Sequence, residues 1–171
     1  MRPIKTSIGT VLFSVLGAML VPTDAAAQAS QETIVGAWTM ESAQSVQPDG
    51  SRVDVFGPNP KGTMIFTRDG RFSLIQMRAD LPKIAANSRD QGTPEEYKAI
   101  VQGSIAYFGT YIFKEAEKTL LLKLERSTFS NQLAQPEQRR LITALSAEEL
   151  KFVNPRTPSG MTLEVSWTRA K

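Results

Sequence analysis

From about residue 34 to the end of the chain, apolar and polar residues alternate with a period of two. The clearest run ends the chain, where Leu163, Val165 and Trp167 alternate with polar neighbours. Because successive side chains of a β-strand point to opposite faces, this alternation predicts strands with one buried face. The pattern predicts eight or nine strands, from the runs 35–45, 52–55, 61–67, 71–77, 104–113, 119–126, 138–145, 149–153 and 161–169.

Short turns separate most of these strands. The Asp69-Gly70 pair between the third and fourth is typical of a tight hairpin, because glycine tolerates a positive φ. In the run 104–113, Gly109 interrupts the apolar face and indicates a bend or a close approach of another backbone. Consecutive strands with tight connections and such bends predict an all-β, antiparallel up-and-down barrel of eight to nine strands.

One segment departs from the alternation. Thr93 is followed by Pro94 and then by Glu96, three residues after the threonine, which is the pattern of a capped helix start. We therefore expect a single short helix over 94–102. The stretch 78–92 before it predicts a long loop, and two interpretations of that loop stay open: a lid or binding loop, or an ordinary mobile surface segment.

The N-terminal residues have the layout of a secretory signal. Arg2 and Lys5 precede an uncharged, mostly apolar run of roughly 14 residues, which is shorter than the roughly 20 that a spanning helix needs. Small residues follow, with Ala27-Gln28-Ala29 as the preferred cleavage site and Ala25-Ala26-Ala27 as the alternative. We expect a signal peptide over 1–29, a barrel domain over 30–171, no membrane span after cleavage, and a periplasmic or secreted protein.

Composition narrows the chemistry. The chain has no histidine and no cysteine, which excludes histidine general bases, thiolate chemistry and His or Cys ligation of a metal. No glycine-rich phosphate loop or calcium-loop spacing occurs either, so we expect no cofactor and no metal. The net charge is only +3 and its signs are interspersed, so nucleic acid is not an expected partner.

Four short motifs are distributed along most of the predicted barrel domain. They are Gly36-Ala37-Trp38, the run 58–62 (Pro-Asn-Pro-Lys-Gly), the run 106–111 (Ala-Tyr-Phe-Gly-Thr-Tyr) and Gln138-Arg139-Arg140. In this combination the chain resembles the bacterial and fungal lipocalin-like domain family. The resemblance implies an antiparallel barrel in which Gly36 and Trp38 are structural, with Trp38 at the closed end and Arg169 as one candidate to cover its indole.

For the aromatic residues and Gln76, strand parity indicates side chains that face the barrel interior, and one of two neighbouring arginines is expected to join them. We expect a ligand to contact Tyr107, Tyr111, Phe66, Phe72, Gln76 and Arg140. The alternative is that the aromatic residues only fill the core, with the tyrosine hydroxyls bonded to nearby backbone. Parity does not decide between Arg139 and Arg140, but an arginine inside the barrel would need a carboxylate partner or an anionic ligand.

These residues favour a binding protein for a small hydrophobic or amphipathic ligand, with an acidic ligand if an arginine points inward. The alternative is a cofactor-free cyclase or isomerase, which the resemblance permits because a few lipocalin-like domains have such activities. That alternative would need an interior carboxylate beside a tyrosine. A third interpretation, an interaction protein of the cell envelope, predicts a filled barrel and an exposed apolar patch.

Overall fold

A computed structural model describes residues 32–157 and 160–171 of the chain. Its strands agree with the predicted ones to within about one residue at each end. They are β1 (Gly36–Val46), β2 (Arg52–Asp54), β3 (Lys61–Phe66), β4 (Arg71–Met77), β5 (Ser104–Lys114), β6 (Thr119–Ser127), β7 (Glu137–Leu145), β8 (Glu149–Asn154) and β9 (Thr162–Arg169).

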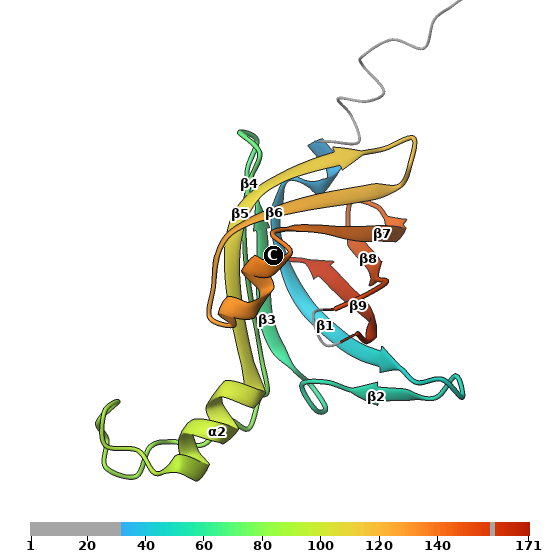
Figure 1. Cartoon of the computed structure of the whole chain (residues 1–171). Coiled ribbons are helices and arrows are strands. Elements are labelled where there is room, and N and C mark those ends of the chain that lie inside the picture. The colour runs from blue at the N-terminus through green and yellow to red at the C-terminus, as the bar shows by residue number, and fades with distance from the viewer. Residues whose placement is uncertain (1–31, 158–159) are drawn as a thin grey trace, which may run out of the picture.

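The strands form one antiparallel sheet that closes on itself (Figure 1). From β3 to β9 each strand pairs with the next along the chain, and β1 pairs with both β3 and β9, from Trp38 opposite Arg169 to Val46 opposite Thr162. β2 pairs only with the last residues of β1, from Gln44 opposite Asp54 onward. The predicted all-β up-and-down barrel is therefore confirmed, as eight closed strands plus one additional strand.

The alternation along each strand separates the core from the outer surface. In β6, Leu120, Leu122 and Leu124 are buried, whereas Lys123 and Glu125 between and beside them are exposed. The same rule holds in β9 for Val165 and Trp167. Burying one face of every strand removes a large apolar area from water, which is the main favourable term in a domain without disulfides.

Gly109 marks the predicted irregularity in β5. The register between β5 and β6 shifts between Phe108 and Gly109, and a Cβ atom at Gly109 would lie 2.0 Å from the backbone oxygen of Lys123. No real side chain tolerates that distance to a backbone atom, so only glycine fits. The expected close approach of another backbone is confirmed, and it allows β5 and β6 to bend around the barrel.

The tight hairpin predicted between β3 and β4 is also present. Gly70 has a φ of +82°, and the amide nitrogen of Gly70 donates a hydrogen bond to the backbone oxygen of Thr67. β3, β5 and β7 each end in a short turn to the next strand, and these three turns lie at the same end of the barrel. We call this the Trp38 end, and the opposite end, with the longer connections, the far end.

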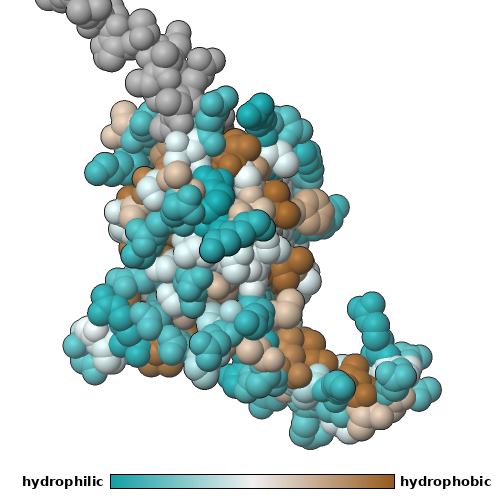
Figure 2. All heavy atoms as spheres, turned by 180° about the vertical axis from the view of Figure 1, so that it is seen from behind, coloured by the Kyte–Doolittle hydropathy of each residue, from teal (hydrophilic) through white to brown (hydrophobic). Residues whose placement is uncertain are grey.

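The longest connection, residues 78–103 between β4 and β5, forms an arm that extends away from the barrel (Figures 1 and 2). It contains α2 (Pro94–Gly103), which begins with the predicted capping box: the Glu96 amide donates to Thr93 Oγ1, and the Thr93 amide donates to a Glu96 carboxylate oxygen at 2.8 Å. The arm does not cover the end of the barrel, so the lid interpretation gains no support.

A second helical segment, the 3-10 helix η1 (Ser130–Ala134) between β6 and β7, does not appear among the predicted elements. Its five residues are too short for a helical periodicity to register. It places Gln132 in a buried position, where Gln132 Oε1 accepts a hydrogen bond from the Ser127 hydroxyl at 2.7 Å.

The expected signal peptide over 1–29 lies outside the described residues. Within 32–157 and 160–171, no helix has both the length and the apolar character that crossing a bilayer requires.

Candidate functional site

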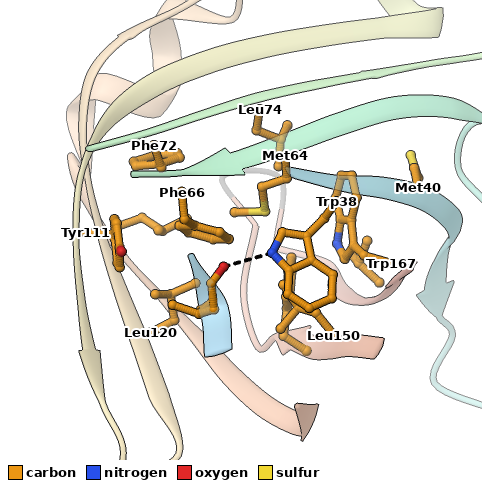
Figure 3. Packing of buried hydrophobic residues seen from close by; sticks show 14 of the residues in the cluster. Trp38, Met40, Met64, Phe66, Phe72, Leu74, Tyr111, Leu120, Leu150 and Trp167 are labelled. Carbon is orange, nitrogen blue, oxygen red and sulfur yellow. Dashed lines mark hydrogen bonds between the residues drawn. The ribbon is translucent and has the colours of Figure 1, made fainter. Parts of the chain in front are cut away.

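The Trp38 end of the barrel is closed by one arginine and one tryptophan. The Arg169 guanidinium carbon lies 3.8 Å from the centroid of the Trp38 ring, and the guanidinium donates to the backbone oxygens of Thr33, Val35 and Ala147. Trp38 is fully buried and donates its indole N–H to the Ile34 oxygen at 2.9 Å (Figure 3). This arrangement combines a cation–π contact with charge-assisted hydrogen bonds, so it stabilises the closed end.

Gly36 makes that arrangement possible. Its φ is +125°, a region that side chains with a Cβ rarely adopt, and a Cβ there would lie 2.6 Å from Arg169 Nη1. The structure thus gives a physical reason for the spacing of Gly36 and Trp38, because the glycine leaves room for the arginine that covers the tryptophan.

Next to Trp38 the barrel is filled with apolar side chains (Figure 3). Phe66 and Tyr111, both predicted to contact a ligand, pack here edge to face with their ring centroids 4.8 Å apart. The Tyr111 hydroxyl donates to the backbone oxygen of Thr67 at 2.9 Å. Burial, together with the nearby Asp69 carboxylate, raises the pKa of the Tyr111 phenol. The geometry of Tyr111 is that of the core-filling alternative.

Aromatic rings continue along the inner wall toward the far end. Phe66 lies 6.4 Å from Phe72, and Phe72 lies 6.0 Å from Tyr107 at an interplanar angle of 74°, all measured between ring centroids. These rings, with Tyr111, form an aromatic row from the Trp38 end to Tyr107. Two of the three ring pairs are edge to face and the Phe66–Phe72 pair is tilted at 32°, so the rings pack on one another as a continuous apolar wall.

Arg140 lies at the far end of this aromatic row. Its side chain is only 2 % exposed, whereas Arg139 is exposed on the outer surface, which resolves the choice that parity left open. Arg140 Nη2 donates to the Tyr107 hydroxyl at 3.3 Å and to Gln138 Oε1 at 2.7 Å, and Nη1 donates to the Arg139 backbone oxygen at 3.0 Å. The structure thus connects five of the six residues predicted to contact a ligand, because Arg140 contacts Tyr107 and the aromatic row links Tyr107 to Phe72, Phe66 and Tyr111.

The charge of Arg140 has no counterion within the described residues. The ion pairs found there lie elsewhere and join side chains that are each at least 39 % exposed. Arg140 is also the only charged residue in the described ranges that is buried. Burying a charge costs several kcal/mol unless it is paired or fully hydrogen-bonded, so the neutral partners of Arg140 leave it undercompensated.

Two further polar groups are buried without any hydrogen bond. They are the side-chain nitrogen Nε2 of Gln138, next to Arg140, and the indole Nε1 of Trp167, beside Trp38. Both are donors. Gln76, another predicted ligand contact, is buried too, near the far end of β4, together with Asn154 at the end of β8. Apart from Trp167 Nε1, the side chains packed around Trp38 are therefore mostly apolar, and most of the buried polar groups lie toward the far end.

The residues predicted from the sequence make up only part of this site. Gln138 follows from the same parity as Arg140, but an unsatisfied amide cannot be inferred from a sequence. The described residues contain no group of three or more Asp, Glu, His or Cys that could hold a metal ion. They also contain no buried Asp or Glu, which is the group that a cyclase or isomerase in this barrel would need beside a tyrosine.

A hollow of about 400 Å³ lies on the β4, β5 and β6 side of the barrel, next to two large apolar side chains that face outward. They are Ile75 and Phe108, exposed by 41 % and 43 %. Figure 2 shows apolar residues scattered among hydrophilic ones on the barrel and the arm. The sequence signal for this hollow is that Ile75 and Phe108 occupy the normally polar positions of the alternation.

The comparisons with known proteins concern the whole barrel. The model of the lipocalin-like domain family matches residues 35–169. A crystal structure of a lipocalin-like protein from Bacteroides uniformis ATCC 8492 is 16 % identical with a TM-score of 0.44, covering 81 % of this chain and 99 % of that one. The redesigned β-barrel mFAP1 bound to DFHBI is 16 % identical with a TM-score of 0.40, covering 82 % and 98 %.

No curated protein matches the chain significantly. The family match, in contrast, runs from the strand that carries Gly36 and Trp38 to the strand that ends at Arg169. This protein therefore belongs to the lipocalin-like domain family.

Proposed function

We propose that this barrel binds a small amphipathic molecule inside its far half. The observation that carries the proposal is the pair of undercompensated polar groups on the inner wall, Arg140 and Gln138 Nε2, at the end of the aromatic row. Buried polar groups are normally satisfied, and exceptions are most often explained by water or by a ligand. A concave wall that is mostly apolar, with a few convergent polar groups, is the usual design of a small-molecule site.

The binding of N-phenyl-1-naphthylamine, an uncharged apolar dye, tests this proposal. We expect its fluorescence to rise on binding to the purified chain and to fall when amphipathic molecules compete. Gln76 and Ile75 are neighbours on β4, with Gln76 buried inside and Ile75 exposed outside. Gln76→Phe narrows the far half and should weaken binding at least fivefold, whereas the matched control Ile75→Phe should not.

Melting temperatures show whether both variants are folded. If Ile75→Phe weakens dye binding and a folded Gln76→Phe does not, the site is the outer hollow and the proposal is wrong. Native mass spectrometry of the chain after incubation with a metabolite extract gives a second readout, in which an added mass is the expected result. A chain that binds neither the dye nor any metabolite contradicts the proposal.

We also propose that the chain is exported to the periplasm or the medium and loses residues 1–29. The support is the charged, apolar and small-residue layout of those residues. Mass spectrometry of the N-terminus of the protein from the extracytoplasmic fraction should find Ser30 as the first residue, or Gln28 if the alternative site is used. An intact Met1 on cytoplasmic protein would contradict the proposal.

A further inference from the structure

The polar groups of the far half indicate what kind of molecule binds there. Resting on the proposed function, we infer that the ligand is an amphipathic carboxylic acid, whose carboxylate lies among Arg140, Gln138 and Tyr107 and whose apolar part lies along the aromatic row. Charge, hydrogen-bond polarity and shape each support this inference from separate observations.

Arg140 is the charged group of the far half. Its guanidinium is buried and forms no ion pair within the described residues. An anion bound beside Arg140 would supply the missing negative charge in a medium where the attraction is strong. A cationic ligand would be repelled by Arg140, and a neutral ligand would leave the charge uncompensated.

The hydrogen-bond partners that are missing around Arg140 are acceptors. Arg140 already uses Gln138 Oε1 and the Tyr107 oxygen as acceptors. The groups that remain are donors: Gln138 Nε2, the Tyr107 hydroxyl proton, and two of the five N–H groups of Arg140, since three hydrogen bonds account for the others. A carboxylate offers about four lone-pair positions and no donor, so it complements this set.

The aromatic row lies directly beside these polar groups. Tyr107 belongs to both groups, because its hydroxyl contacts Arg140 and its ring packs on Phe72. A ligand with its carboxylate at Arg140 therefore has an apolar wall directly beside its hydrocarbon part. An acid without an apolar part, such as acetate, would gain no contact with that wall and should bind weakly.

Calorimetric titration with three ligands of equal chain length tests the inference: decanoate, decanol and decylamine. We expect decanoate to bind the wild-type chain at least tenfold more tightly than decanol, since hydrogen bonds to charged groups are the strong ones, and we expect no binding of decylamine. Arg140→Met keeps the length of the side chain without its charge and should abolish the preference for decanoate. The control Arg71→Met removes an exposed arginine from the outer surface and should keep it.

The outcomes separate the inference from the proposed function. If decanol binds as tightly as decanoate, or if a folded Arg140→Met retains the preference, the inference is wrong while the barrel remains a binding protein. If decanoate, decanol and the dye all fail to bind, the proposed function is wrong as well. Should Arg140→Met not fold, Gln138→Leu removes the unsatisfied Nε2 donor and should weaken decanoate binding severalfold with little effect on decanol. Unchanged binding of decanoate in Gln138→Leu would overturn the inference.

Discussion

Replacing Arg169 should destabilise the barrel far more than replacing any exposed arginine. Arg169→Met removes three hydrogen bonds to backbone oxygens, with donor–acceptor distances of 2.5, 2.7 and 2.9 Å, and the contact with Trp38. Two of these hydrogen bonds are partly buried and the one to Ala147 is exposed. Such charge-assisted hydrogen bonds contribute about 1 kcal/mol each, and a cation–π contact of this kind contributes about 0.5–1 kcal/mol. We therefore expect the free energy of unfolding to fall by about 3–4 kcal/mol.

Arg169→Lys separates the two contributions. A lysine ammonium retains a positive charge near the Trp38 indole, but as a compact group it cannot reach three separate oxygens as the planar guanidinium does. We expect a loss of about half that of Arg169→Met. The matched control is Arg52→Met, because Arg52 pairs with Glu164 across an exposed surface and such pairs contribute at most about 1 kcal/mol.

Urea unfolding, followed by tryptophan fluorescence and analysed by linear extrapolation, measures these differences. In thermal unfolding, about 3 kcal/mol corresponds to a decrease of roughly 6–12 °C in a domain of this size. If Arg169→Met lies within about 0.5 kcal/mol of wild type, or no further from it than Arg52→Met, then the closed end does not depend on Arg169 and this reasoning is refuted.

Three further predictions concern single positions. Gly109→Ala places a Cβ atom against the Lys123 oxygen, so it should cost about 3 kcal/mol or more or prevent folding, as circular dichroism would show; a folded variant of wild-type stability would contradict the close approach. Thr93→Ala removes the cap of α2 and should speed amide exchange in α2 without changing the melting temperature, because the arm extends away from the barrel. Burial and Asp69 raise the pKa of Tyr111, so above about pH 10 the unfolded chain releases a proton that the folded chain keeps, and stability should fall with rising pH. That fall, measured by urea unfolding at pH 8.5 and 10.5, should be smaller in Tyr111→Phe; equal slopes would refute it.

The strands are predictable from the sequence because each has a face of consistent polarity. β9 and most of β6 alternate clearly: Val165 and Trp167 in β9, and Leu120, Leu122 and Leu124 in β6, are buried, whereas Leu121 breaks the polar face of β6 and is only partly buried. α2 is predictable because its start depends on Thr93, Pro94 and Glu96, which are close neighbours in the chain. In each case the interactions that decide the structure are local or repeat with a fixed period.

The far half of the barrel is less predictable because its interactions are not local. β7 begins with polar residues on both faces, so its own alternation does not assign Arg140 to the interior. The orientation follows from the pairing of Arg140 with Leu120 on β6, since directly paired residues share a face. The unsatisfied Gln138 Nε2 depends on distances to residues of several strands, which no pattern within one strand encodes.

The arm between β4 and β5 also has a consequence for the order in which the barrel folds. Met77 pairs with Ser104, so the first contact of this hairpin must close a loop of about 26 residues, whereas the β3–β4 hairpin closes one of about four. Closing the longer loop costs about 1.7 kcal/mol more in chain entropy than closing the shorter one. The pairing of β4 with β5 is therefore slower than the pairing of β3 with β4. Because α2 can form from its own capping box, its early formation would shorten the effective loop. Replacing the arm with a two-residue turn should therefore speed folding while leaving the barrel intact.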